Sequence, residues 1–336
     1  MLRLVAATLV LVSHCYPLTG RVEPFGELSG WTMGEVGVVM FFAMSGFLIA
    51  KSWHDQPQLV PFAVKRALRL MPALVVAVSF TALVLGPVFS SLPTGTYLAD
   101  PGTWLYIVRN SALYTVSGRL PGVYEHNVYP DAVNGSLWTL PVEACAYVMA
   151  AGLGVLGILR NSAAMLACAI AALLLASDLS PLTGSATETT AGGNLPIVLE
   201  LIATFLLGSL MFAVRDRLRL SWVLLGLLVA VWVVCWKSPM DGVTGILAVG
   251  YGVLVLAFRT PAELRRVTAP GDVSYGMYVY AFPVQQAVVH VWGPGLSPAG
   301  LFVLAYPITY GLALVSWRLI ERPALRLKRF VARTAV

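Results

Sequence analysis

Charged residues are scarce in this chain: 11% of its 336 residues are charged, and 58% are hydrophobic. Because an average soluble domain has about 25% charged residues, this composition excludes an ordinary soluble enzyme or binding domain. Cysteine is also scarce, and the four cysteines fall in apolar segments, at Cys15, Cys145, Cys168 and Cys235. Their irregular spacing matches neither a metal site nor a disulfide framework. The sequence also shows no internal repeat, low-complexity tract or soluble domain.

Long apolar segments fill most of the chain. A helix that spans a bilayer needs about 17 to 25 apolar residues. Such segments occur near 2–18, 34–52, 66–87, 138–159, 162–177, 195–214, 220–236, 242–258, 273–292 and 299–318. We therefore expect an all-α, polytopic membrane helix bundle of about ten transmembrane helices. We expect the first segment to be a helix of the bundle rather than a signal peptide, because no small-residue cleavage site follows it.

Basic residues are distributed unevenly among the connections between these segments. Loops on the cytoplasmic side of a membrane protein are enriched in Lys and Arg. Here 18 of the 22 basic residues fall on one side, and the exceptions are Arg21, Arg109, Arg119 and Lys237. We expect both termini on the cytoplasmic side of a bacterial cytoplasmic membrane. This asymmetry accounts for the net charge of +6 without a nucleic-acid partner.

The longest stretch outside the expected spans covers about 88–137 and is rich in tyrosine. We expect it to fold as a cap over the outer mouth of a single transmembrane domain that covers residues 1–336. Aromatic side chains in such a cap suit a sugar, but they suit a macrolide or a lipid equally.

His14 and Glu143 are ionisable side chains inside apolar segments, where such groups are costly and often functional. His14 follows Arg3 by eleven residues, which places it about 16 Å further along a helix and inside the membrane. Glu143 lies one to two turns inside the fourth segment, at a depth that matches His14. A neutral imidazole beside a carboxylate can take a proton from an alcohol. The alternative is a scaffold in which the two groups only bind each other.

Two further groups of residues have competing interpretations. Arg66 and Arg69 are three apart and share a helix face, and guanidinium groups suit phosphate oxygens. An ordinary cytoplasmic cluster of positive charge is the simpler interpretation from sequence alone. In Ser45-Gly46-Phe47 of the second segment, small residues permit close helix contact, and packing is the simpler interpretation of Gly46.

Six motifs in this order resemble the membrane acyltransferase 3 family, which comprises integral-membrane enzymes that O-acylate sugars, polysaccharides and some antibiotics. They are Arg3 with His14; Phe41-Phe42 followed by Ser45-Gly46-Phe47-Leu48; Arg66 and Arg69 before Pro72; Ser136-Leu137-Trp138 leading to Glu143; Ser274-Tyr275 with Pro283; and Ser316 with Glu321-Arg322-Pro323.

The resemblance implies an O-acyltransferase that uses acyl-CoA, acetyl-CoA above all, and no metal. His14 would be the general base that deprotonates an acceptor hydroxyl of a carbohydrate or a glycosylated secondary metabolite. The donor would be bound from the cytoplasm by residues that hold its phosphates and line its path, namely Arg66, Arg69, Arg3, Ser45, Gly46 and Phe47. The candidates for acceptor binding are Trp138, Asn134, Tyr275 and Gln285, and packing between helices is the simpler interpretation of Gln285.

The chain departs from the family pattern at Val39, where many members have an acidic residue. Glu35 lies four residues earlier on the same helical face, so either Glu35 or Glu143 alone supplies the acid that pairs with His14. Glu321-Arg322-Pro323 is expected to end the last helix. The main alternative function is a proton-coupled transporter, although the sequence shows no inverted repeat and no paired broken helices.

Overall fold

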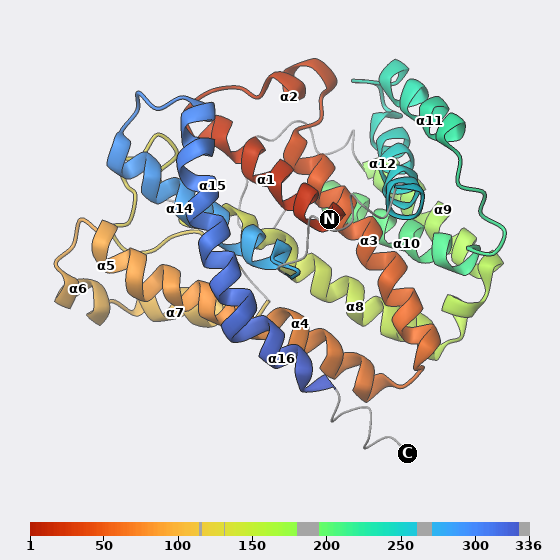
Figure 1. The fold of residues 1–336 in the computed structure, drawn as a ribbon, viewed down its shortest axis with the longest axis horizontal. Helices are drawn as coiled ribbons and strands as arrows, with labels where there is room; N and C mark the ends of the chain where they lie inside the picture. Colours follow the sequence, from red (N-terminus) through yellow and green to blue (C-terminus); the bar gives the residue numbers. More distant parts are fainter. Residues whose placement is uncertain (114–115, 131, 180–194, 261–270, 329–336) are drawn as a thin grey trace. The chain divides into compact units, whose positions relative to one another are not determined.

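The computed structural model describes residues 1–113, 116–130, 132–179, 195–260 and 271–328, and helices dominate these residues (Figure 1). Their order is α1 (Leu2–Leu18), α2 (Pro24–Ser29), α3 (Met33–Asp55), α4 (Leu59–Phe80), η1 (Thr81–Leu85), α5 (Gly86–Phe89), α6 (Thr94–Ala99), α7 (Pro101–Ser111), η2 (Gly135–Trp138), α8 (Thr139–Val155), η3 (Ile158–Arg160), α9 (Ser162–Leu179), α10 (Leu195–Ala213), α11 (Trp222–Val234), α12 (Asp241–Arg259), α14 (Ser274–Trp292), α15 (Pro298–Ser316), η6 (Trp317–Glu321) and α16 (Arg322–Arg326). Within the described part of the chain, the only β pairing is an isolated bridge between Ser90 and Val123.

Each of the ten expected apolar segments contains a helix, so the all-helical prediction is confirmed for the described residues. Six helical stretches are long and apolar enough to cross a membrane: Met33–Asp55, Leu59–Phe89, Gly135–Val155, Leu195–Ala213, Asp241–Arg259 and Pro298–Arg326. Three apolar helices are shorter, at Leu2–Leu18, Ser162–Ala176 and Trp222–Val234. The count of ten crossings and the side on which the termini lie stay predictions.

The last helix does not end where the sequence pattern suggested. After α15 the chain makes a π-helical turn, η6, and continues into α16 as far as Arg326. Pro323 occupies one of the first two positions of α16, directly after the π turn, and the helical stretch continues past it. The expectation that Glu321-Arg322-Pro323 ends the helix is therefore wrong. Its consequence is that Glu321 stays inside the helical stretch and is buried.

Within the described residues the chain forms two compact units, and each is considered by itself. The first unit comprises Met1–Ala6, Phe25–Ala63 and Val142–Ala269. In it α3 packs against α10. A Cβ added at Gly46 would overlap the carbonyl oxygen of Phe205, and one at Gly208 would overlap that of Ala43. The two backbones therefore touch at glycines, which is the close helix contact that small residues permit.

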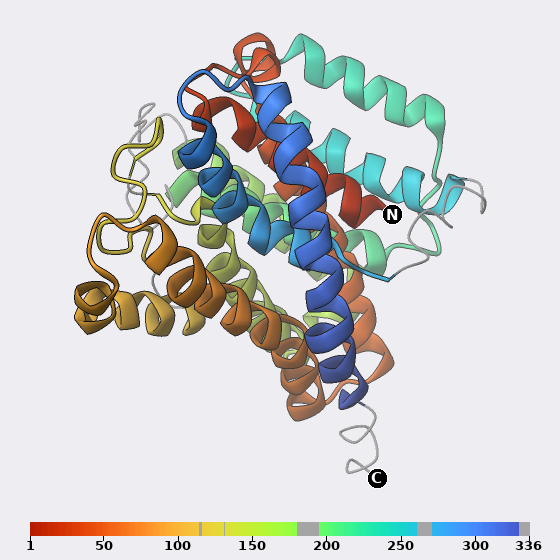
Figure 2. The same ribbon diagram turned by 60° about the vertical axis from the view of Figure 1, so that its left-hand side comes forward.

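The second unit comprises Ala7–Pro24, Val64–Pro141 and Pro270–Val336. In it α14 and α15, drawn in blue, lie side by side in both views (Figures 1 and 2). Gly276 permits this approach, because an added Cβ would lie 2.8 Å from the Cα of Ala313. Nearly all of α14 is buried, including Tyr275, Phe282 and Gln285. Its aromatic and amide side chains explain why α14 is not among the most apolar helices.

The expected cap segment contains α6, α7 and a folded connection to η2. Tyr97 donates a hydrogen bond to the carbonyl of Ala82 at 2.7 Å, and its own carbonyl accepts one from Thr103. Tyr106 and Tyr124 are fully buried, so these aromatic rings are core residues rather than an open platform. Burial raises the pKa of the Tyr97 phenol to about 12 and also raises that of Tyr106, so both phenols stay protonated at neutral pH.

Large apolar side chains are exposed on many helices. Val234 on α11 is 85% exposed, and Val148 on α8 is 75% exposed. Further examples are Leu156, Val223, Leu227, Val303 and Leu319. A soluble monomer rarely exposes so much apolar surface, whereas a membrane protein presents such side chains to lipid.

Candidate active site

His14 lies on α1 in the second unit, and an aromatic ring of α14 packs against it. The edge of the Phe282 ring meets the imidazole at 5.1 Å between centroids and an interplanar angle of 79°. Its Nδ1 atom is buried and has no hydrogen-bond partner among the described residues. Most buried polar atoms in proteins are hydrogen-bonded, so this nitrogen is an exception in the fold.

Gln285 connects α14 to α1 beside His14. Its side-chain Nε2 donates to the carbonyl of Leu11 at 2.8 Å and contacts the Cys15 sulfur at 3.0 Å. The side chain is fully buried. Gln285, which the sequence suggested as an acceptor ligand, therefore joins two helices, and its Oε1 atom is left without a hydrogen-bond partner in the described part of the chain.

Asn134 anchors the turn that leads into α8. Its Nδ2 donates to the carbonyl of Val279 on α14 at 2.9 Å, and its Oδ1 accepts from the backbone of Ser136 at 3.2 Å. The next residue, Gly135, lies so close to Phe282 that an added Cβ would be 2.7 Å from the ring. The contacts of Asn134 are thus structural, and they set this turn against the ring that contacts His14. Trp138, at the end of η2, is partly exposed.

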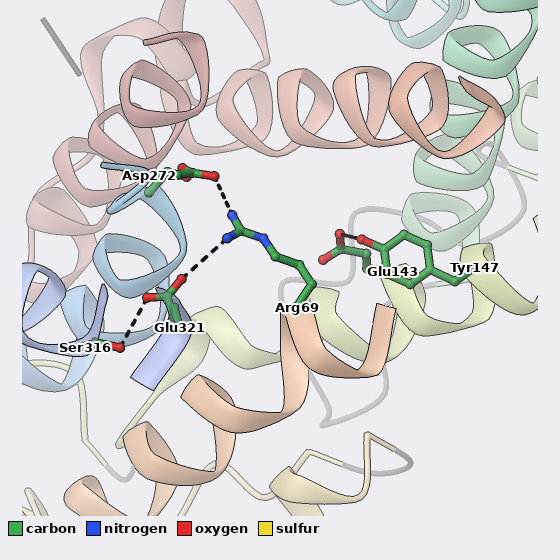
Figure 3. Close-up of polar contacts among 7 residues, drawn as sticks. Arg69, Glu143, Tyr147, Asp272, Ser316 and Glu321 are labelled. Carbon is green, nitrogen blue, oxygen red and sulfur yellow. Dashed lines mark hydrogen bonds and ion pairs between the residues drawn. The ribbon is translucent and has the colours of Figure 1, made fainter. Parts of the chain in front are cut away.

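Glu143 lies on α8 in the first unit and binds two hydroxyl groups. Tyr147, one turn further along α8, donates to Glu143 Oε1 (Figure 3). Ser45 on α3 lies 3.4 Å from the same carboxylate oxygen and 3.4 Å from the Tyr147 hydroxyl. Sequence reasoning missed Tyr147, although its spacing of four residues from Glu143 was a usable signal. The predicted pairing of Glu143 with His14 stays a prediction, because the two residues belong to different units.

Glu35 caps the N-terminus of α3. Its Oε2 accepts from the backbone of Thr32 at 2.6 Å, while the Thr32 hydroxyl accepts from the backbone of Glu35 at 3.1 Å. This reciprocal pair is a capping box. It accounts for the position of the exposed Glu35 carboxylate, and a role for Glu35 as the acid beside His14 stays a prediction.

The Ser45-Gly46-Phe47 segment lies in the interior of the first unit. Gly46 provides the backbone contact with α10, and its carbonyl accepts from Ser209 at 3.1 Å. The Phe47 ring packs against Phe212 with the centroids 5.4 Å apart. Helix packing therefore accounts for Gly46, as the simpler interpretation of the sequence held.

Arg69 on α4 lies between two carboxylates of the second unit (Figure 3). Its Nη2 is 2.6 Å from Asp272 Oδ2, and its Nη1 is 3.6 Å from Glu321 Oε2. Ser316 donates to the other oxygen of Glu321 at 3.2 Å. The Tyr275 ring lies 5.9 Å from the guanidinium, and its hydroxyl donates to the carbonyl of Leu70 at 3.0 Å.

Sequence reasoning missed Asp272 and misinterpreted Glu321. Asp272 lies in a connection 203 residues from Arg69, so no local spacing pairs them. Glu321 had a signal in its position five residues after Ser316 at the end of an apolar segment, but the proline at 323 suggested a helix end. The remaining donor candidates, Arg66 on α4 and Arg3 on α1, are both partly buried.

Comparison with known proteins supplies the context for these residues. The sequence profile of a family described as an acyltransferase domain matches residues 1–318. The O-acetyl transferase of Shigella phage Sf6 is 36% identical over 150 residues, which are 44% of this chain and 42% of that protein. Nodulation protein 10 of Rhizobium leguminosarum bv. viciae is 31% identical over 160 residues, 44% of this chain and 41% of that protein.

The matched segments thus span less than half the length of these two curated relatives. No solved structure matches the chain. The profile, by contrast, extends from the first helix, with His14, through α15 and into η6, and so includes five of the six motifs in full and the Ser316 of the last. The chain belongs to the acyltransferase 3 family.

Proposed function

We propose that this protein is a membrane O-acyltransferase that moves an acyl group, acetyl in the simplest case, from acyl-CoA to a hydroxyl group of an acceptor. The family match and the phage relative named an O-acetyl transferase support this reaction class. The observation that carries the proposal is His14, whose buried Nδ1 has no partner among the described residues. The acceptor we propose is a carbohydrate or a glycosylated secondary metabolite, met in the cytoplasmic membrane of a bacterium.

In the proposed reaction His14 is the general base. As the acceptor oxygen attacks the thioester carbonyl carbon, the hydroxyl proton moves to the imidazole. The carbon–sulfur bond then breaks, and the leaving CoA sulfur takes the proton from the imidazolium. The products are an acyl ester and free CoA, and the imidazole returns to its neutral form.

The other proposed roles follow the chemistry of each side chain. Glu143, held by Tyr147 and Ser45, is the acid that stabilises the charged imidazolium, with Glu35 as the alternative. The sequence offered Arg66, Arg69 and Arg3 for the phosphates of CoA, because guanidinium groups bind phosphate oxygens; of these, we propose Arg66 and Arg3 for that role and consider Arg69 separately below.

The remaining site candidates have proposed roles of two kinds. Phe47, beside Ser45 and Gly46, would line the path of the acyl-CoA arm. Trp138 would stack on the acceptor, because its ring is partly exposed, and Asn134, Tyr275 and Gln285 would shape the surrounding wall.

The test compares wild-type protein with His14→Gln, and uses His54→Gln as the control. His54 lies in the last turn of α3 and is exposed. In detergent, acetyl-CoA should raise the melting temperature of all three proteins, since a ligand at 100 times its Kd stabilises by about 2.7 kcal/mol. Acetyl transfer to a panel of hydroxyl acceptors should fall by about 10²- to 10⁴-fold in His14→Gln alone.

Two outcomes would count against the proposal. If no acyl-CoA of any chain length stabilises the wild-type protein, a transporter becomes the better interpretation. If His14→Gln keeps its transfer activity, His14 is not the base.

A further inference from the structure

We infer that Arg69 is a positioning residue that holds α14 and η6 against α4, and that it does not serve as a ligand of the CoA phosphates. This inference deepens the proposed function, because it rests on acyl-CoA being the donor. It separates the two arginines that the sequence presents as one phosphate-binding pair. The evidence is the pair of carboxylates that hold the Arg69 guanidinium (Figure 3).

Two carboxylates already face the single positive charge of Arg69, and this arrangement disfavours the binding of another anion there. One guanidinium faces Asp272 at 2.6 Å and Glu321 at 3.6 Å. A phosphate group placed at the same guanidinium would lie close to both carboxylates, and like charges at short range repel strongly where water is scarce. The Arg69 side chain is 12% exposed, that of Glu321 is 2% exposed and that of Asp272 is 38% exposed, so water screens the repulsion from Glu321 little and that from Asp272 in part.

The position of Glu321 depends on the π-helical turn. In an α-helix, residues four apart lie above one another, but Ser316 and Glu321 are five apart and are joined by a hydrogen bond of 3.2 Å. The wider η6 turn makes this contact possible. Such turns often occur at functional sites. Here the turn directs a buried carboxylate at Arg69.

The backbone immediately before α14 packs closely against the η6 turn. Gly271 has φ +127°, and an added Cβ would overlap the ring of Trp317, the first residue of η6. Asp272 follows, and its Oδ1 accepts a hydrogen bond of 2.5 Å from Ser274 in the first turn of α14. The carboxylate that binds Arg69 is thus fixed to the start of α14.

α14 links this network to His14. The same helix carries Phe282, which contacts the imidazole, and Gln285, which bonds to α1 on either side of it. A shift at the start of α14 therefore changes the surroundings of His14. Arg69 would act on the reaction through this helix rather than through the donor.

The two interpretations of Arg69 predict opposite effects when its carboxylate partners are neutralised. If Arg69 binds phosphate, Asp272→Asn and Glu321→Gln remove competing negative charges, and acetyl-CoA binds more tightly. If Arg69 positions α14, both variants lower kcat by about 10- to 100-fold, as a small misplacement of reacting groups does, while the Kd for acetyl-CoA stays nearly unchanged. The Kd is measured by titration of the detergent-purified full chain.

Replacing Arg69 itself also distinguishes phosphate binding from positioning of α14. A lysine is a point charge that still attracts phosphate, but it lacks the planar fork that reaches two carboxylates. We expect Arg69→Lys to lose kcat as Arg69→Met does. Recovery of acetyl-CoA affinity by lysine after its loss in Arg69→Met would overturn the inference.

A matched control and a rescue variant keep the test decisive if single variants fold poorly. Lys51 and Asp55 also lie 2.6 Å apart, but their side chains are 52% and 55% exposed, so Asp55→Asn should change neither stability nor kcat. The triple variant Arg69→Met, Asp272→Asn, Glu321→Gln removes the guanidinium together with the two carboxylates that face it, and we expect a higher melting temperature for it than for Arg69→Met.

A triple variant no more stable than Arg69→Met would overturn the inference. Wild-type protein that binds no acyl-CoA would instead overturn the proposed function, so the two failures are distinguishable. Tighter acetyl-CoA binding in Asp272→Asn or Glu321→Gln would leave the proposed function standing and reject only the positioning role.

Discussion

The side chains around Glu143 show how one carboxylate is oriented by neighbouring hydroxyl groups. Tyr147 is 92% buried, with 8% of its surface exposed, and donates to Glu143. Ser45 approaches the same oxygen from α3. These two hydroxyl groups approach the same carboxylate oxygen, so Tyr147 and Ser45 fix the orientation of the Glu143 side chain within the first unit.

Tyr147→Phe should therefore lower both stability and activity. Removing a hydrogen bond to a charged group costs about 1.5–3 kcal/mol, which thermal unfolding with and without acetyl-CoA measures. The control is Tyr106→Phe, because the Tyr106 hydroxyl is buried and has no partner in the described residues. Removing an unpaired buried hydroxyl should be neutral or stabilising. A larger loss of stability in Tyr106→Phe than in Tyr147→Phe would contradict this account.

At the residue scale, the sequence was informative about which side chains are unusual and uninformative about their partners. His14 and Glu143 were identifiable because ionisable groups are rare in apolar helices. Asn134 and Gln285 were identified as candidates for acceptor binding, but their hydrogen bonds run to Val279 and Leu11, which are distant in sequence. Contacts of this kind depend on the tertiary fold, so no local pattern contains them.

The packing of α3 against α10 shows how the first unit is built at the scale of elements. Both helices are apolar enough to span a membrane, and in lipid the hydrophobic effect does not drive such helices together. Close backbone contact at Gly46 and Gly208 does so instead. The Ser209 hydroxyl adds a hydrogen bond to the Gly46 carbonyl at 3.1 Å.

Gly46→Ala should separate these helices. The added methyl group meets backbone rather than a flexible side chain, so we expect a loss of about 1–3 kcal/mol in the free energy of unfolding. Gly226→Ala on α11 is the control, because nothing lies within 4 Å of its added Cβ. If Gly46→Ala melts like the wild-type protein but binds acetyl-CoA weakly, Gly46 belongs to the donor site and packing is not its main role.

Helices were predictable at this scale, and their ends were less so. Each expected run of apolar residues coincides with a helix, because a helix satisfies its backbone hydrogen bonds within the segment itself, and six helical stretches are long and apolar enough to cross a membrane. The π-helical turn η6 carries the helical stretch of α15 beyond the expected end of its segment at 318, whereas η1 lies inside the segment expected at 66–87. A π turn inserts one residue into a helix without changing the composition of the segment, so a hydropathy pattern does not reveal it.

At the scale of the whole molecule, the distribution of charge predicts orientation. Lys and Arg are enriched in cytoplasmic loops, and 18 of the 22 basic residues share one predicted side. Asp216 lies in a connection on that side, and His126 lies in the expected cap on the other. Both residues are exposed.

Cysteine labelling tests this orientation in intact cells. In a cysteine-free background, His126→Cys should react with a membrane-impermeant maleimide, whereas Asp216→Cys should react only after the membrane is permeabilised. The reverse labelling pattern would invert the topology and place the proposed cap in the cytoplasm. Equal labelling of both positions would reject an odd number of crossings between them.

The exposed valines and leucines of α8 and α11 have a consequence for how the protein is stabilised. Side chains such as Val234, 85% exposed, meet hydrocarbon both in the native protein and when a helix leaves its neighbours within the membrane. Their transfer free energy is therefore the same in both states. Exchanging one aliphatic residue for another at these positions should not change the equilibrium between packed and separated helices. Cohesion of the helices must come from the interior, where glycine contacts and a small number of polar pairs have no equivalent in lipid.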